Sequence, residues 1–539
     1  MNCSLLQSEN DCNTGCNYLK ESAMRDLIEL ANLLNKTKLK TSGALDIILE
    51  PGSKMQQMYE ALISQRIQSD EDAATWQLES DDDPSKLPNL KNKLKDRMLD
   101  SVFLLDFKEP GFSDRQKAYF ECYKKWAAAM ILVMRNAKVS GIDLLEKLLR
   151  HAQRFEFTEL TCDILRVLKI HYSTNAGDLK KYEQTREQLH HYQEIWNMEN
   201  QVEDFYTELV IRYVNSKATK MEVSEQAKVY YSIIMPYMKK SDSFKLQLFG
   251  RLIQIFGYSS VNDYVTTARL CEEAIQFFDK KDYDSGFPLQ VFYYNLITCY
   301  LQLREFEKGR VIIERCQGLV DAGSFNWFKL QELFFLLAMH TAHYDAAAKV
   351  LHRAMEDPRF ENQSFQITEI WKIYQAYVHF LVRAGKLSAE TLPADRNLKF
   401  RLGKFLNEIP VFSKDKRGMN IPILIIQILY ALIDRDYKQC IDRMEGIEKY
   451  CSRYLKQNDT FRSNCFIKML LQTPIYAFRR ERVTRQTQKL YEMLCAVPME
   501  VANQTYEIEI IPYEALWQLT LNALDRGGST PEVPRPRVS

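Results

Sequence analysis

Three histidines in the middle of the chain are spaced closely enough to suggest a metal site. His340 and His343 are three residues apart where one expected helix ends, and His352 lies on the following expected helix. Neutral imidazole is a common ligand of zinc and related ions. No cysteine or carboxylate accompanies them at ligand spacing, and histidine is common at helix ends. We therefore interpret the three as solvated or hydrogen-bonded side chains, and we expect no metal and no other cofactor.

Two Arg-x4-His pairs suggest a second kind of chemistry. They are Arg166 with His171 and Arg186 with His191. Both resemble the short active-site motif of helical ribonucleases of the HEPN type, which use a helix-borne arginine and histidine at a dimer interface. The residue after each arginine matches that family poorly, and so short a motif occurs by chance in a helical protein of this length. A helical ribonuclease is therefore kept as an alternative, and we expect no enzyme activity.

Other patterns in the sequence favour binding over catalysis. The HExxH motif of metalloproteases, the glycine-rich loop of NTPases and the GxGxxG motif of dinucleotide-binding proteins do not occur. A basic cluster, Arg479, Arg480, Arg482 and Arg485, could contact a phosphate backbone or an acidic partner. A solvated helix face is the more common role of such a cluster.

The composition indicates a folded protein with no general affinity for nucleic acid. Hydrophobic residues make up 46% of the 539 residues and charged residues 27%, which is enough apolar surface for a core along nearly the whole chain. The 72 Lys and Arg almost balance the 71 Asp and Glu, so the net charge is only +1. A protein that tracks nucleic acid along its body would be much more basic. We expect no nucleic-acid partner.

The cysteines and the hydropathy pattern bear on the compartment. Most of the 12 cysteines fall singly inside helical patterns: Cys122, Cys162, Cys271, Cys299, Cys316, Cys440 and Cys495. They are interpreted as reduced core residues. The single cluster, Cys3, Cys12 and Cys16, lacks a second CxxC or histidine pair that would complete a zinc site. The sequence shows no signal peptide and no run of eighteen apolar residues, so we expect a cytoplasmic protein that does not enter the membrane.

The elements that would position any site are helices that repeat about every 38 to 42 residues. Three positions recur: Tyr264, Cys271 and Ala274 in the first copy, Phe306, Ile313 and Cys316 in the second, and Tyr344, Leu351 and Ala354 in the third. In each copy an aromatic residue opens a helix and the other two follow seven and ten residues later. This spacing places all three on one helix face, which must be buried against a neighbour.

The same region resembles the tetratricopeptide repeat (TPR) family. The positions that carry the resemblance are Tyr293, Leu296, Tyr300, Phe306, Gly309, Ile313 and Cys316, then Phe334, Ala338, Tyr344, Ala347, Leu351, Ala354 and Pro358, and later Leu424, Tyr437, Cys440, Met444 and Ile447. The chain departs from the family where Ile297 and Phe335 replace a small residue, and its periods exceed the family's length of about 34 residues. The resemblance implies a right-handed α-solenoid of antiparallel helix hairpins whose inner face binds a protein or peptide.

The predicted organisation is all-α. The expected parts are a disordered N-terminus at 1–20, a helical module with an acidic linker at 21–88, divergent hairpins at 89–244, TPR-like repeats at 245–455, C-terminal helices at 456–525 and a disordered tail at 526–539. If the helices before Gly177 form a bundle of their own, the solenoid is shorter than this division implies.

The leading hypothesis for function is a non-enzymatic scaffold or adaptor. In TPR proteins the first helix of each pair lines the binding surface, so the resemblance implies a lining of Tyr294, Thr298, Gln302, Lys329, Glu332 and His340. The alternative is a ligand- or peptide-responsive regulator with an effector or DNA-binding module at residues 20–80. That segment has no obvious recognition helix with polar side chains grouped for base edges. The sequence indicates neither the partner nor the oligomeric state.

Overall fold

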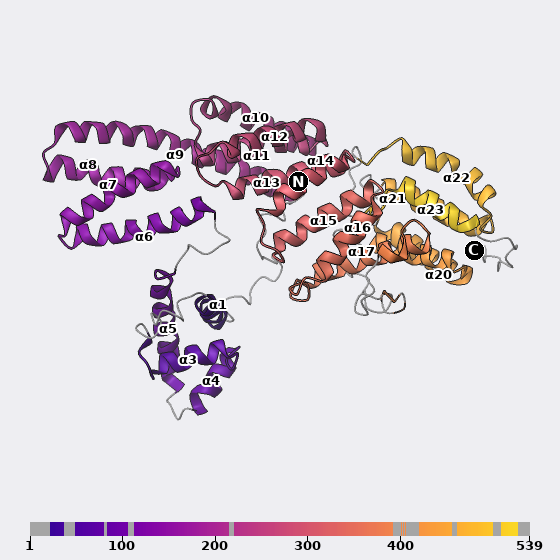
Figure 1. Cartoon of the computed structure of the whole chain (residues 1–539), viewed down its shortest axis with the longest axis horizontal. Helices are drawn as coiled ribbons and strands as arrows, with labels where there is room; N and C mark the ends of the chain where they lie inside the picture. The colour runs from indigo at the N-terminus through magenta and orange to yellow at the C-terminus, as the bar shows by residue number, and fades with distance from the viewer. Residues whose placement is uncertain are drawn as a thin grey trace. The chain divides into compact units, whose positions relative to one another are not determined.

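The computed structural model describes residues 22–36, 49–79, 84–105, 113–214, 220–391, 400–401, 403, 405, 420–454, 461–499 and 508–525. The expected disordered ends, 1–20 and 526–539, and the acidic residues 80–83 lie outside this part. Of the described residues 80% are helical, in 21 α-helices and with no strand, which confirms the all-α prediction (Figure 1). The chain divides into two compact units at Met198, inside the long helix α9 (Leu179–Val214). We refer to them as the first and the second unit.

The first unit opens with a small helical module. Its helices are α1 (Ser22–Lys36), α3 (Lys54–Ile63), α4 (Asp70–Glu79) and α5 (Leu87–Val102). α1 packs against α3 and α5, and buried side chains such as Leu27, Met58 and Met98 form a core within the module. An ion pair of 3.0 Å between Lys95 and Asp26 joins α5 to α1 at the surface. The helices that follow in this unit are α6 (Asp114–Met134), α7 (Lys138–Arg154), α8 (Thr158–Ile170) and the start of α9, and α6–α7 and α7–α8 are packed pairs.

The second unit continues the helical series. After the end of α9 come α10 (Lys220–Met238), α11 (Phe244–Ser259), α12 (Tyr264–Asp279), α13 (Gly286–Gln302), α14 (Phe306–Gln317), α15 (Phe325–His340), α16 (Tyr344–Met355), α17 (Phe365–Arg383), α19 (Asn420–Ile433), α20 (Tyr437–Tyr454), α21 (Phe461–Ile475), α22 (Arg480–Cys495) and α23 (Tyr513–Asp525). From α10 onward each helix packs against the next, and α13 also contacts α15 (Figure 1). Helices that contact both neighbours in order are typical of a helical repeat.

The predicted role of the repeated aromatic residues is confirmed. Tyr264, Phe306 and Tyr344 are the first residues of α12, α14 and α16. The small and medium residues that follow on the same face are buried in all three copies, with 5% of the surface exposed at most: Cys271, Ala274, Ile313, Cys316, Leu351 and Ala354. The period therefore reports one amphipathic helix per copy that packs against its neighbours.

The helix junctions share one type of turn that was not predicted from the sequence. Six junctions have a residue of positive φ, between 57° and 66°, two positions before the next helix begins: Asn136, Glu156, Asn262, Arg304, Ala342 and Arg435. At each, the following N–H donates to the carbonyl five residues back, over 2.8 to 3.1 Å. This Schellman arrangement satisfies helix-end carbonyls and normally uses glycine. Its recurrence from α6 to α20 indicates a repeat in both units.

The first helices of the pairs lie deep in the second unit. Most side chains of α13 and α15 are buried, including Ile297 and Phe335 at 0% exposure, whereas Phe287 and Phe325 near the helix starts are exposed. Ile297 and Phe335 occupy the positions at which a TPR protein carries a small residue. A helix that is apolar on most of its circumference must be covered by its neighbours, so the large side chains at these two positions fill space between helices.

A substitution at one junction tests the turn. Ala342 is exposed and has a φ of 60°, a conformation in which its Cβ is strained. We expect Ala342→Gly to increase the free energy of unfolding of α15 and α16 by about 0.5–1 kcal/mol, because glycine removes that strain. Hydrogen exchange of these helices, corrected for intrinsic rates, is the measurement.

The matched control is Ala346→Gly, four residues later in α16. This residue has helical geometry, so glycine should decrease stability by about 0.5–1 kcal/mol there. Equal losses in both variants would contradict the role assigned to the turn.

Candidate interaction groove between α6 and α7

Local sequence signals determine where α6 begins and how the chain turns from α6 into α7. Ser113 caps α6: its Oγ accepts from the N–H of Gln116 at 3.3 Å, and the Gln116 Oε1 accepts from the N–H of Ser113 at 2.9 Å. This reciprocal capping box satisfies two donors at the start of α6. The Schellman turn at Asn136 then leads directly into α7.

Arginine 115 ties the beginning of α6 to the end of α7. Its Nε donates to the carbonyl of Phe155 at 3.0 Å, and its guanidinium lies 4.8 Å from the centre of the Phe157 ring. The carbonyls after a helix end lack partners within the helix and carry partial negative charge. Arg115 supplies both the hydrogen bond and the positive charge that this end requires.

Glycine 141 allows the two helices to approach each other closely. A Cβ at this position would lie 2.8 Å from Val133 Cγ2, 3.2 Å from Val133 N and 3.3 Å from the carbonyl oxygen of Ala129. Two of these three atoms belong to the backbone of α6 and cannot rotate away. The residue therefore sets the separation of α6 and α7.

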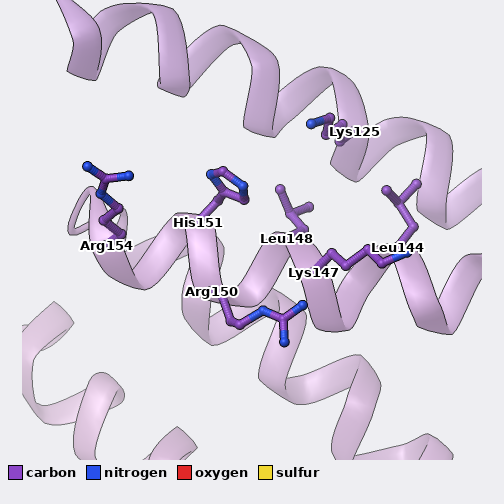
Figure 2. A pocket seen from close by; sticks show the side chains of 7 residues that line it. All are labelled: Lys125, Leu144, Lys147, Leu148, Arg150, His151 and Arg154. Carbon is purple, nitrogen blue, oxygen red and sulfur yellow. The ribbon is translucent and has the colours of Figure 1, made fainter.

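A shallow groove of about 500 Å³ follows this helix pair (Figure 2). Its lining comes almost entirely from α7, with one side chain from α6: Lys125, Leu144, Lys147, Leu148, Arg150, His151 and Arg154. On α7 Leu144, Lys147, His151 and Arg154 recur at helical spacings of three and four and share one face, and Leu148 and Arg150 lie on either side of it. Figure 2 shows that Leu148 and His151 point from α7 toward α6, whereas Arg150 points away from α6. We call these seven residues the cationic groove.

The charge around the groove is positive. Residues 113–157 contain nine Lys or Arg and five Asp or Glu, a net charge of +4 compared with +1 for the whole chain. Lys125 pairs with Glu121 and Lys147 with Asp143, each at 2.6 Å and four residues apart. Their side chains are 42% to 64% exposed, and ion pairs of this kind contribute about 0.3–0.5 kcal/mol. An incoming anion can therefore replace either carboxylate at little cost.

The groove is suited to binding. Its polar side chains are ammonium, guanidinium and imidazole groups, and its lining includes no carboxylate, thiol or hydroxyl that could act as a nucleophile or as a paired acid. Leu144 and the buried Leu148 add an apolar floor. The arrangement can hold negative groups beside apolar ones.

Three of the residues expected to line a binding surface lie on α13. The Tyr294 side chain is 2% exposed, and its hydroxyl donates to the carbonyl of Asn326. Gln302 is 4% exposed. Thr298 is half-buried and donates to the carbonyl of Tyr294 at 2.9 Å, one turn earlier in the helix. A partner cannot contact Tyr294 or Gln302 unless the structure that covers them moves, so Thr298 is the most accessible of the three.

The other three expected residues lie on α15. Lys329 and Glu332 form an ion pair of 2.7 Å with side chains only 11% and 10% exposed, and Glu332 also accepts from the hydroxyl of Tyr374 at 3.0 Å. His340 is 5% exposed, and its Nε2 lies 2.7 Å from the carbonyl oxygen of Glu509. These contacts join α15 to its neighbours. Sequence reasoning placed the six residues on the correct helices but did not detect how deeply those helices are covered.

Burial keeps His340 neutral. It lowers the pKa of this imidazole from 6.5 to about 3, and the charges of Arg304 and Arg462 act in the same direction. The hydrogen bond to the Glu509 carbonyl raises the pKa but does not compensate. With Nε2 donating to that carbonyl, the neutral ring satisfies the one acceptor it faces.

The remaining histidines have separate partners. His343 is exposed, its Nδ1 lies 2.9 Å from the Thr341 hydroxyl, and its ring stacks on Phe306. His352 Nε2 lies 2.8 Å from a carboxylate oxygen of Glu356. Within the described ranges no group of three or more His, Cys, Asp or Glu side chains is arranged to hold a metal ion.

The two Arg-x4-His pairs lie on α8 and α9. Arg166 pairs with Asp163, and His171 is half-buried at the start of a π-helical turn that follows α8. Arg186 and His191 are both exposed on α9. In the part of the chain that the structure describes, no hydrogen bond joins either arginine to its histidine.

The structure also gives the exposure of the basic cluster at the start of α22 and of the cysteines. Arg479, Arg482 and Arg485 face solvent. Cys495 was expected in the core but is exposed at the end of α22. Cys122, Cys271, Cys299, Cys316 and Cys440 are buried as predicted.

Sequence reasoning missed the cationic groove, although its signal was present. Lys147, His151 and Arg154 share one face of a helix with Leu144 and Leu148. The sequence analysis placed this region only among the divergent hairpins at 89–244. The approach of Lys125 from α6, which makes the stripe one side of a groove, follows from the fold.

Comparison with known proteins found no family model, no curated protein and no solved structure that matches the chain. Among the described helices, none has both the length and the apolar content needed to cross a membrane.

The close approach at Gly141 can be tested by a single methyl group. Alanine usually stabilises a helix by about 1 kcal/mol relative to glycine. At Gly141 the new Cβ would overlap α6, so we expect Gly141→Ala to decrease the free energy of unfolding of the α6–α7 pair by about 1 kcal/mol. Hydrogen exchange of α6 and α7 measures the effect.

The matched control is Gly446→Ala in α20, where a Cβ would meet no atom within 4 Å. We expect it to increase the stability of that helix by about 0.5–1 kcal/mol. If Gly141→Ala were stabilising too, close packing at α6 would not be the constraint.

The pKa of His340 predicts a dependence of stability on pH. In the unfolded chain this imidazole takes up a proton below pH 6.5, whereas the folded protein resists until about pH 3. The stabilisation is therefore complete above pH 6.5 and is lost progressively as the pH falls toward 3. At about pH 5 the loss should be about 2 kcal/mol.

The comparison variant is His340→Gln, which keeps a donor for the Glu509 carbonyl but does not titrate. Hydrogen exchange of α15 and α23 between pH 7.5 and 5 should show a smaller loss of stability in the variant than in the wild type. Parallel losses would mean that His340 is protonated in the folded state or titrates elsewhere in the range.

Proposed function

We propose that this protein is a non-enzymatic scaffold that binds a protein or peptide partner on a TPR-like array of antiparallel helix hairpins. The observation that carries the proposal is the helix junction repeated at six places, with the same turn and the same helix start two residues later. Repeated helix pairs form an extended surface that each partner contacts at several points, and they need no catalytic centre.

The surface available to a partner differs from the one that the family resemblance implies. Of the six residues that the resemblance implies, Tyr294, Gln302, Glu332 and His340 are buried and Lys329 is paired with Glu332, which leaves Thr298 as the most accessible. The α6–α7 pair, in contrast, presents an open groove with five basic side chains. The proposal therefore includes this groove among the binding surfaces. It also includes a cytoplasmic location, because buried thiols such as Cys316 and Cys440 suit a reducing compartment.

The test is affinity purification of the tagged full-length chain from its native cells, with nuclease treatment and mass spectrometry. We expect a specific protein in reproducible amount, which then binds the purified chain with a Kd of about 10 µM or tighter. The tag expressed alone is the control.

A second arm addresses the enzymatic alternative. Purified protein should leave single-stranded and structured RNA intact. RNA cleavage that is lost in His171→Ala or His191→Ala would contradict a non-enzymatic role, as would the recovery of nucleic acid and no protein in the purification.

A further inference from the structure

The cationic groove combines two features that select a kind of ligand. One is the basic stripe of Lys147, Arg150, His151 and Arg154 along α7, with Lys125 opposite on α6. The other is a leucine floor within that stripe. Resting on the proposed scaffold function, we propose that the groove binds a segment of the partner protein in which Asp or Glu residues are interspersed with leucine or similar apolar residues.

The leucine floor favours a peptide over a simple anion. Both leucines line the groove between charged side chains; Leu148 is 1% exposed, so the apolar area that a ligand can cover comes from the half-buried Leu144. Apolar area that a ligand covers contributes about 25 cal/mol per Å². Phosphate and the sugar–phosphate backbone present charged oxygen atoms to such a floor, whereas a leucine side chain can cover it.

The basic side chains of the groove favour a bound segment of negative charge. Lys125 and Lys147 are already held by Glu121 and Asp143, which shows that carboxylates fit beside them at 2.6 Å. These carboxylates are largely exposed and weakly bound, so carboxylates of a partner can exchange with them. Arg150 carries an exposed planar guanidinium group, a group that pairs with carboxylates through two hydrogen bonds.

The length of the stripe indicates how much chain is bound. The basic residues begin at Lys147 and end at Arg154, two turns later, and Lys125 lies across the gap. Two turns of helix rise about 11 Å, so a segment of roughly four extended residues or two helical turns spans the charges. A short linear segment of the partner is therefore sufficient.

Fluorescence anisotropy with three labelled peptides tests the inference on the full-length protein. Each probe has about 12 residues, enough for the two turns of the stripe and flanking chain. The first alternates Asp or Glu with Leu, the second replaces the acids by Asn and Gln, and the third keeps the acids and replaces Leu by Ser. We expect the first probe to bind at least about tenfold more tightly than either of the others.

The variant that tests the site is Lys147→Glu with Arg150→Glu. Both side chains are exposed, so the fold should be retained, which circular dichroism and the unfolding midpoint verify. The matched control is Arg269→Glu with Lys308→Glu in the second unit, where both side chains are more than 60% exposed and paired with nearby glutamates. It makes the same change in net charge. We expect at least about tenfold weaker binding in the groove variant and about twofold or less in the control.

Several outcomes would overturn the inference. Equal binding of the acidic probe without leucine would mean that the groove recognises charge alone. Tighter binding of a single-stranded oligonucleotide than of the first probe would assign the groove to nucleic acid. Equal losses in both charge-reversal variants would mean that the binding is not located in the groove.

The failure of this inference can be distinguished from failure of the proposed function. Both charge-reversal variants enter the affinity purification beside the wild type. If the wild type and the groove variant recover the same partner, the scaffold function holds and the groove is not its docking site. If the wild type recovers no protein, the scaffold function itself fails.

Discussion

One buried guanidinium joins the C-terminal helices of the second unit. Arg462 Nη2 lies 2.6 Å from Glu509 Oε1 and 2.8 Å from Glu514 Oε2, and its Nη1 donates to the carbonyl of Val497 at 2.6 Å. The side chains of Arg462 and Glu509 are 0% exposed. Burial alone would lower the pKa of Arg462, but the hydrogen bonds and charges of the two glutamates outweigh it and raise the pKa. Two buried charges are tolerated only when nearly every hydrogen-bonding atom has a partner, as here.

This ion pair also accounts for the burial of His340 at the end of α15. Glu509 accepts from the N–H of Tyr513 at 2.6 Å through the carboxylate that holds Arg462, and its backbone carbonyl faces His340 on α15. The segment before α23 is thus fixed to α21 by charge and to α15 by a hydrogen bond. Moving this segment to admit a partner would break the hydrogen bond to the buried His340 and would disturb a fully desolvated ion pair. This cost would oppose the binding of a partner at this end of α15.

The sequence separation of the residues in each interaction determines how much of the fold could be predicted. The helices that begin at Tyr264, Phe306 and Tyr344 were predictable. The residues seven and ten positions after each aromatic residue lie on the same helix face, and this pattern is local in the sequence. The junctions were not predictable, because Arg304 and Ala342 adopt a positive-φ conformation that is usually occupied by glycine. The cover over α15 was not predictable either, since His340 and Glu509 are 169 residues apart. The groove was partly predictable. Its basic residues on α7 form a local pattern, whereas the approach of Lys125 from α6 depends on the fold.

The proposed recognition of a partner is therefore assigned to charged helices such as α7. Most side chains of α13 and α15 are buried against neighbouring helices, and a buried side chain cannot also contact a partner. α7 has one buried face, through Leu145 and Leu148, and a basic face that its own weak ion pairs only partly neutralise. Its separation from α6 is fixed by Gly141 and Arg115, so the basic side chains are carried on a rigid pair and little order is lost on binding. If the proposed groove binds an acidic segment, we expect the association to be fast and to be weakened by salt.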